Sequence, residues 1–349
     1  MKYLRNAWYC AGWEQDLTDE PRGIKMLGQQ MLILRTNDGV IHAMDGACPH
    51  RFAPLYKGRV ENGIVQCPYH GLEFNTEGKC VHNPHSDVIP DKAALKKYPV
   101  AVRNLAIWVW MGDPEKADES LLVEEMEWAQ SSEYATGYGY TYVNANYQLV
   151  IDNLLDLTHA PFMHTMSFGG VPPEFGKKSP VKREFKVDGR RIHSNYFLGE
   201  RDTIGLFKPF FPHDRCQQFS FMTLHQPTNL TFEISIIEAG EEDRHSGLQI
   251  PSFHFITPED EKTAHYFYAS GRNTHIDDEQ VTTMMMAGVK MAFQNEDEPM
   301  IRSIQDIMGT PDLFSLSPAI LASDAAGVAA RRSLDKMIAE EELEPLSIK

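Results

Sequence analysis

The chain has 349 residues, of which 42% are hydrophobic and 23% charged, a composition typical of globular proteins with one large or two average domains. Its net charge of −16 argues against a nucleic-acid-binding protein, because the phosphate backbone would repel it. The sequence has no apolar run of membrane-spanning length and starts with a charged segment unlike a signal peptide, so we expect a cytoplasmic protein.

The first third of the chain shows short strand patterns joined by tight turns. MLILR and VIHAM flank the turn sequence Asn37-Asp38-Gly39, which suits a hairpin. VENGIVQC and LEFNTEGKCV repeat this pattern, and AVRNLAIWVWMG indicates one further strand. We therefore predict a small all-β domain over residues 1–115.

An acidic, polar connector with a short helix is expected over residues 113–134. Residues 147–164 then carry apolar side chains at helical spacing, which predicts a helix. Pro161 should end or kink this helix near His159.

A second domain is predicted over residues 116–349. Residues 181–271 alternate between apolar and polar in several runs, which indicates an antiparallel sheet. Helices are expected at 278–309 and at 322–343, the second beginning at a Ser323 cap.

Two mixed cysteine–histidine pairs lie close together in the first domain. One residue separates Cys48 from His50, and two separate Cys67 from His70. Zinc is the usual metal for such ligands, but zinc ribbons favour pairs of cysteines. One thiolate and one imidazole from each of two loops is the set that a 2Fe–2S cluster with Cys on one iron and His on the other requires. Because imidazoles are neutral, such a cluster has a raised reduction potential and accepts electrons readily.

The remaining cysteines have no such partners. Five cysteines in a chain of this length do not form a disulfide framework, which fits a reducing compartment. We expect Cys10, Cys80 and Cys216 to be buried core residues, and His82 and His85 to lie on the surface.

A second group of metal-binding side chains lies on the helix predicted at 147–164. Asp156 and His159 are three residues apart and share a helix face, and Asn153 precedes them on an adjacent stripe. His164 would point elsewhere on an unbroken helix, but the disturbance at Pro161 lets both imidazoles converge.

Two histidines need one carboxylate to form the facial triad of a non-heme Fe(II) oxygenase. The carboxylate is either Asp156 or one of three consecutive acidic residues, Glu296, Asp297 and Glu298, which sequence alone ranks about equally. The competing interpretation is a pair of buried core histidines. The cluster pattern upstream favours the iron site, because one-electron delivery to an oxygen-activating iron is a coherent pairing.

The whole chain resembles a known family. CPHRFAPL followed by CPYHGLEF is similar to the Rieske motif, and NLLDLTHAPFMH matches the mononuclear-iron motif of Rieske non-heme iron oxygenases. RNAWY, IWVW, FITPE, GRN and DAAGVAARRSLD are similar to the vanillate and dicamba O-demethylase branch. The resemblance implies an α+β fold, with an N-terminal all-β Rieske domain before a helix-grip-like catalytic domain of antiparallel sheet and C-terminal helices.

The resemblance also implies roles for single residues. Cys48 and Cys67 would hold one cluster iron and His50 and His70 the other. The catalytic iron would be held by His159, His164 and Asp297.

Asp156 would join His159 of one subunit to His70 of the next in a homotrimer. Asn153 is expected beside the iron, and His254 occupies the place of a substrate-facing histidine in the dicamba branch. A buried strand histidine is the alternative for His254.

The activity implied is O2-dependent O-demethylation of a methoxylated aromatic acid, giving a phenol and formaldehyde. Electrons would come from NAD(P)H through a separate reductase or ferredoxin. Arg51, Lys57 and Arg59 lie near the cluster ligands and are candidates for its docking patch. The alternatives are aryl methyl hydroxylation, for example on an arylsulfonate, ring dioxygenation, a Rieske electron carrier alone and a zinc-stabilised binding protein.

Overall fold

The computed structural model describes residues 3–167, 170–177, 181–204 and 207–343. The chain divides into two compact units, one formed by Arg5–Glu124 with Thr257–Asp260 and the other by the rest. The domain boundary predicted at 115/116 stays a prediction. No helix among the described residues has both the length and the apolar character needed to cross a membrane.

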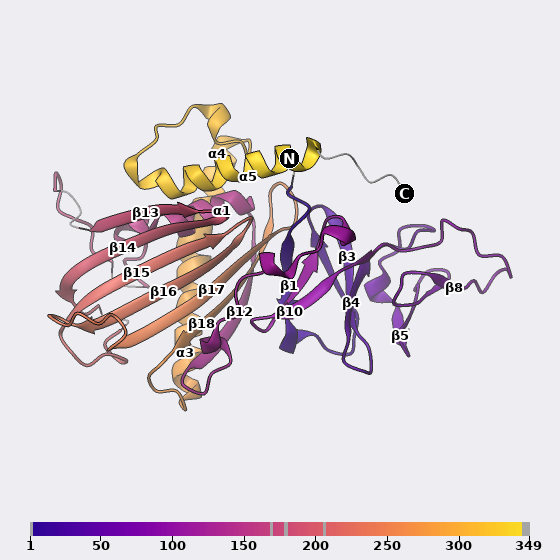
Figure 1. Cartoon of the computed structure of the whole chain (residues 1–349), viewed down its shortest axis with the longest axis horizontal. Helices are drawn as coiled ribbons and strands as arrows, with labels where there is room; N and C mark the ends of the chain where they lie inside the picture. The colour runs from indigo at the N-terminus through magenta and orange to yellow at the C-terminus, as the bar shows by residue number, and fades with distance from the viewer. Residues whose placement is uncertain (1–2, 168–169, 178–180, 205–206, 344–349) are drawn as a thin grey trace. The chain divides into compact units, whose positions relative to one another are not determined.

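The first unit is built from three small antiparallel sheets (Figure 1). Their strands, in the order of each sheet, are β1 (Trp8–Trp13), β11 (Ala106–Trp110) and β10 (Val100–Arg103); β2 (Arg22–Met26), β3 (Gln29–Arg35), β4 (Ile41–Asp45) and β9 (Lys97–Tyr98); and β5 (Arg59–Glu61), β6 (Ile64–Gln66), β7 (Glu73–Phe74) and β8 (Cys80–His82). The 3-10 turns η1 (Glu14–Asp16) and η2 (Leu55–Lys57) lie between strands, and η3 (Pro114–Lys116) and η4 (Glu119–Leu121) follow β11. The all-β prediction for this part of the chain is confirmed.

The stretch AVRNLAIWVWMG forms a hairpin and not the single strand predicted. Asn104 and Leu105 adopt φ angles of +52° and +61°, so the chain reverses between β10 and β11. Glycine usually occupies left-handed positions in such turns, and a leucine there is rare. This turn has no glycine, so the sequence lacks the residue that would have indicated it.

The second unit is a seven-stranded antiparallel sheet covered by helices (Figure 1). The sheet order is β12 (Ala135–Val143), β18 (Ala264–Arg272), β17 (Leu248–Pro258), β16 (Asn229–Glu238), β15 (Arg215–His225), β14 (Arg191–Asp202) and β13 (Lys182–Asp188). Burial alternates along β15, as the period-2 sequence pattern predicts. Strand β12 was not predicted, although its sequence ATGYGYTYV carries alternating tyrosines.

The helices of this unit are α1 (Tyr147–Leu155), α2 (Ala160–Met163), α3 (Glu279–Met291), α4 (Glu298–Met308) and α5 (Ala325–Leu343). The shorter turns are η5 (Glu127–Ala129), η6 (Leu157–His159), η8 (Phe314–Leu316) and η9 (Ala322–Asp324), and η7 (Ala292–Asp297) is π-helical. Helix α3 lies on β12, where a side chain at Gly137 would place its Cβ 2.3 Å from Met286 Cγ.

The C-terminal helices confirm the predicted segments with two differences. The segment 278–309 is one helical run that changes to π geometry in the middle. Ser323 is not a cap, because it lies inside η9 and the Asp324 carboxylate accepts the Leu321 amide at 2.6 Å instead.

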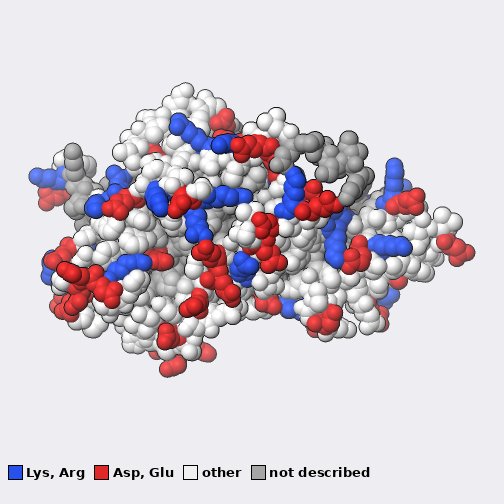
Figure 2. All heavy atoms as spheres, in the orientation of Figure 1, with Lys and Arg blue, Asp and Glu red and all other residues white. Residues whose placement is uncertain are grey.

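Acidic and basic side chains are interspersed over the face of the molecule drawn in Figure 2.

Candidate active site

The segment 147–164 is broken at Asp156 and not at Pro161. Asp156 ends α1 with an extended backbone (φ −117°, ψ 92°), and its carboxylate accepts the Thr158 amide at 2.9 Å to start η6. Pro161 lies in the first turn of α2, where a missing N–H costs nothing. The predicted shared helix face of Asp156 and His159 is therefore wrong, because no continuous helix joins them.

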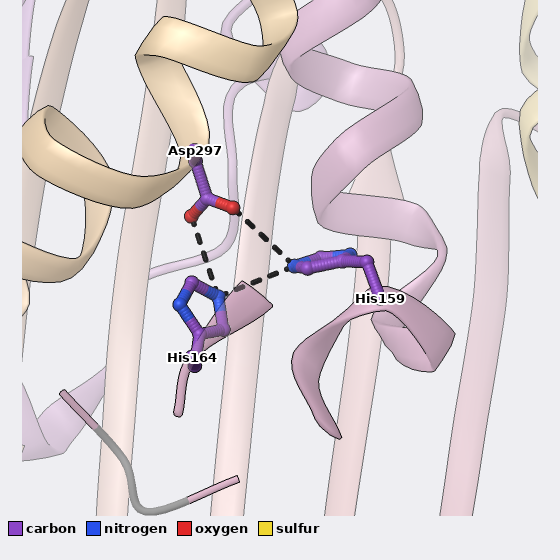
Figure 3. Close-up of side chains that lie close together, drawn as sticks. All are labelled: His159, His164 and Asp297. Atoms are coloured by element: carbon purple, nitrogen blue, oxygen red, sulfur yellow. Dashed lines mark hydrogen bonds and ion pairs between the residues drawn. The ribbon is translucent and has the colours of Figure 1, made fainter. Parts of the chain in front are cut away.

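The break brings His159 and His164 together with Asp297 from the end of η7 (Figure 3). The two Nε2 atoms lie 3.3 Å apart. Asp297 Oδ1 is 3.5 Å from His159 Nε2, and Asp297 Oδ2 is 3.5 Å from His164 Nε2. Three ligand atoms from two segments far apart in the sequence thus face one point.

This triangle fits a metal ion. Metal–nitrogen and metal–oxygen bonds of about 2.1 Å place neighbouring ligands of an octahedron about 3 Å apart. The observed separations are close to that value, and the three ligands occupy one face and leave the others open. The donor set of two imidazoles and one carboxylate is the one that non-heme Fe(II) prefers.

The π-helical turn η7 aims two consecutive carboxylates at the same imidazole. Glu296 Oε2 lies 2.7 Å from His164 Nδ1, on the ring edge opposite Nε2. The amide and the hydroxyl of Ser167 also donate to Glu296. Of the three acidic residues that the sequence ranked equally, Asp297 faces both histidines and Glu296 supports one from behind. Glu298 instead accepts from Asn144 at 3.4 Å.

Burial and hydrogen bonding act differently on these carboxyl groups. Burial raises the pKa of Asp297, and the nearby His164 and His159 only partly oppose this. Burial also acts to raise the pKa of Glu296, but hydrogen bonds from Ser167 and His164 outweigh it, so this pKa lies below its usual value. A buried carboxylate facing two imidazoles is stabilised by a cation between them.

Two other predicted residues lie beside this triangle. Asn153 Nδ2 donates to Asp297 Oδ1 at 3.2 Å. His159 Nδ1 contacts the backbone carbonyl of Asp156 at 2.7 Å and not its carboxylate. The Asp156 carboxylate accepts instead from Tyr196 Oη at 3.3 Å, and its bridging role stays a prediction.

A cavity of about 740 Å³ opens beside the three ligands. Its walls are mostly apolar and aromatic, with a few hydroxyl groups from the sheet. His254 lines this cavity and is 8% exposed, and its Nδ1 contacts Tyr266 Oη at 2.6 Å. Its Nε2 has no hydrogen-bond partner among the described residues. Burial lowers the pKa of His254 to about 4, so its imidazole is neutral at physiological pH.

The four predicted cluster ligands lie in the first unit on two loops of the same form. Phe52 N donates to Cys48 O at 2.8 Å, and Gly71 N donates to Cys67 O at 3.1 Å. Both donors have left-handed backbone, with φ of +58° and +74°. Each loop therefore folds back over its own cysteine four residues later.

These loops place the cysteines inside and the histidines outside. Cys48 and Cys67 are 1% and 2% exposed, whereas His50 is exposed and His70 is half-buried. The two imidazole rings lie 4.6 Å apart at their centroids. Burial raises the pKa of the Cys48 thiol to about 11. A thiolate at this position needs a compensating cation, which fits an iron cluster. Cys10, Cys80 and Cys216 are buried free thiols and His82 and His85 are exposed, as predicted.

Sequence comparisons match both parts of the chain. Residues 7–99 match the Rieske [2Fe-2S] domain, and residues 143–340 match the vanillate O-demethylase oxygenase C-terminal domain. The chain is 33% identical to the oxygenase component of chloroacetanilide N-alkylformylase of Rhizorhabdus wittichii, covering 97% of each chain. It is 32% identical to the oxygenase component of dicamba O-demethylase of Stenotrophomonas maltophilia, covering 97% of this chain and 98% of that one.

A solved structure agrees with the sequence matches. Dicamba monooxygenase with non-heme iron and dicamba superimposes with a TM-score of 0.82 and 30% identity, over 98% of this chain and 99% of that one. An all-β 2Fe–2S domain and a sheet-and-helix domain with a His–His–Asp site define a two-centre oxygenase. The chain belongs to the Rieske non-heme iron oxygenases that carry the vanillate O-demethylase oxygenase C-terminal domain.

Family membership has two direct consequences. The protein is an oxidoreductase with a Rieske 2Fe–2S cluster and a mononuclear iron, and a bare electron carrier is excluded because residues 143–340 match the catalytic domain. Two of its relatives are named as oxygenase components, which marks each of them as one part of a larger enzyme system. Sequence reasoning missed three features that depend on tertiary placement. They are the contact of Glu296 with His164, the hydrogen bond from Tyr196 to Asp156, and the cations Lys177, Arg183 and Arg201 in the cavity lining.

Proposed function

We propose that this chain is an O-demethylase that acts on a methoxylated aromatic acid and forms a phenol and formaldehyde. The observation that carries this proposal is a triangle of His159, His164 and Asp297 beside an aromatic cavity of about 740 Å³. A cavity of that size accommodates a substituted benzene ring with room for orientation. The name of the dicamba O-demethylase relative supports the same reaction.

In this proposal His159, His164 and Asp297 hold the mononuclear iron, which supplies O2 activation when bound. Asn153 fixes the Asp297 carboxylate by its hydrogen bond to Oδ1. The apolar lining of the cavity excludes water and keeps the methyl group of the substrate against the open face of the triangle.

Cys48, His50, Cys67 and His70 are the proposed ligands of the 2Fe–2S cluster, which supplies one-electron transfer when bound. We also propose a homotrimer in which Asp156 of one chain lies beside His70 of the next. Support comes from the partial exposure of Asp156 and His70. Light scattering after size-exclusion chromatography should give the mass of three chains, and a monomer would contradict it.

His254 is the proposed contact for a polar oxygen of the substrate. Its Nε2 is buried in the cavity wall with no partner among the described residues, and an unpaired buried polar atom is costly. An oxygen of a bound aromatic acid would satisfy it.

The reaction can be tested with purified oxygenase and a matching reductase. Formaldehyde should appear in step with O2 uptake from one or more methoxybenzoates. A ring diol without formaldehyde would indicate a dioxygenase, and methyl hydroxylation without ether cleavage, as on an arylsulfonate, would indicate the other alternative. Either result would contradict O-demethylation.

We further propose that Arg51, Lys57 and Arg59 bind the reductase. All three are exposed, on the loop and strand around the first pair of cluster residues. Exchanging all three for Glu should slow cluster reduction and weaken its dependence on salt. Unchanged reduction kinetics would rule this patch out.

A further inference from the structure

The cavity beside His159 carries positive charge although the chain as a whole is acidic. Its lining contains Lys177, Arg183 and Arg201. Among the described residues that line it, the one carboxylate is Asp297, which faces the two histidines. The local charge is therefore opposite to the net charge of −16.

Arg183 is directed to the cavity side of the sheet by the register of β13. It pairs with Tyr196 on β14, and cross-strand partners project from the same face. Tyr196 is buried, and its hydroxyl accepts the Leu157 amide at 3.0 Å, beside the iron site. The neighbours of Arg183 point to the opposite face, where Lys182 and Glu184 form an ion pair of 2.8 Å.

Arg201 repeats this arrangement on β14. It pairs with the buried Cys216 of β15 and so faces the same side. Its neighbours Glu200 and Asp202 project to the other face, where Arg215 lies 3.6 Å and 3.4 Å from their carboxylates.

The alternation of the strands thus separates two sets of charges. Cations on the outer face are neutralised by carboxylates of the same strand or of the adjacent strand. Arg183 and Arg201 on the cavity side form no ion pair with a carboxylate of the described residues, although acidic residues flank both in sequence. Unpaired guanidinium groups at the edge of an apolar cavity attract an anionic ligand.

We infer that Arg183 and Arg201 form a cationic rim of this cavity that recognises the carboxylate or sulfonate of an aromatic substrate. This inference rests on the proposed function, because it concerns the substrate of the same cavity. It adds a charged subsite to the neutral contact at His254, and it makes these arginines determinants of specificity for aromatic anions.

Binding measurements on the iron-loaded oxygenase, without reductase, test the rim directly. Isothermal titration calorimetry compares para-methoxybenzoate with its neutral isostere para-methoxybenzamide. The acid should bind about tenfold more tightly, since two partly exposed ion pairs contribute modestly each. Higher salt should reduce this preference, because exposed charges are screened.

Single substitutions separate the two faces of β13. Arg183→Met and Arg201→Met should each weaken binding of the acid about two- to fivefold and leave the amide unchanged. Lys182→Met is the matched control, because it removes a cation from the adjacent position on the outer face. A third probe, para-methoxybenzenesulfonate, shows whether the rim prefers the carboxylate or the sulfonate.

An acid that binds no more tightly than the amide, or does not bind, overturns the inference. Equal losses for Lys182→Met and Arg183→Met also overturn it, because a general field would then explain the preference. The proposed function fails separately: tight binding of the acid without formaldehyde release would contradict O-demethylation and leave the rim in place. Equal formaldehyde release from acid and amide, with equal affinities, would support O-demethylation and overturn the rim.

Discussion

Glu296 accepts a hydrogen bond from Nδ1 of His164 at 2.7 Å, on the ring edge opposite the Nε2 atom that faces Asp297. A carboxylate only accepts, so this contact places the proton of the imidazole on Nδ1 and leaves the Nε2 lone pair available to a metal ion shared with Asp297. Consecutive residues of one π-helical turn therefore act on both nitrogens of one histidine. Single-turn π-bulges in helices are frequent at functional sites.

Removing this contact should weaken iron binding without removing a ligand. Glu296→Gln can no longer provide an anionic acceptor, and loss of such outer partners typically costs about 10- to 100-fold in metal affinity. Anaerobic titration of iron-depleted protein with Fe(II) measures this affinity, and the visible absorption of the 2Fe–2S cluster shows that the first domain is intact. Glu298→Gln is the matched control, because Glu298 contacts Asn144 and neither histidine. Equal affinities for both variants would contradict the role of Glu296.

Loss of a ligand should be distinguishable from loss of its support. Asp297→Ala is expected to reduce the iron content from about three atoms per chain to about two, since only the cluster remains filled. Iron analysis together with the cluster absorption gives both numbers on one sample. An iron content unaffected by Asp297→Ala would mean that another carboxylate completes the site.

The cluster ligands could be predicted from sequence because all four lie within one short stretch. Each loop folds back on its own cysteine through a local hydrogen bond, so spacing alone carries the geometry. The third iron ligand could not be ranked in this way. Asp297 is distant from His159 in sequence, and only the π-helical turn decides which of three adjacent acids faces the histidines.

The break in the first catalytic helix shows a different limit. Pro161 is the visible helix breaker, yet the chain breaks at Asp156, whose side chain caps the following turn. Aspartate is common both inside helices and at their caps, so its choice here depends on contacts such as that with Tyr196. The rim of Arg183 and Arg201 was likewise beyond prediction, since it depends on strand register.

The first cluster loop makes a prediction about colour. Cys48→Ser should abolish the red-brown absorption of the Rieske cluster, because a serine oxygen is a poor substitute for a thiolate at this iron. Cys80→Ser removes a second buried thiol of the same domain, whose Sγ contacts His82 O at 3.4 Å, and should keep the colour. Colour in Cys48→Ser would contradict the assignment, and absorption lost equally from both variants would indicate unfolding instead.

His254 should make the catalytic domain sensitive to acid. Burial lowers its pKa from 6.5 to about 4, so between these values the unfolded chain binds a proton that the folded chain does not. The free energy of unfolding is therefore highest above the pKa of the unfolded state. It falls by roughly 3 kcal/mol in total as the pH drops to the pKa of the folded state. Glutamine does not titrate, so the His254→Gln variant does not lose this free energy on acidification. Its stability deficit relative to the wild type should therefore shrink as the pH falls from about 7 to about 4.

Urea unfolding at a series of pH values, followed by a signal from the second unit, measures that difference. Tyr266→Phe is the control, because it removes the contact to His254 Nδ1 while burial, the cause of the lowered pKa, remains. Its stability deficit should stay constant over the same pH range. If the deficit of His254→Gln is also constant, burial does not lower the pKa of His254.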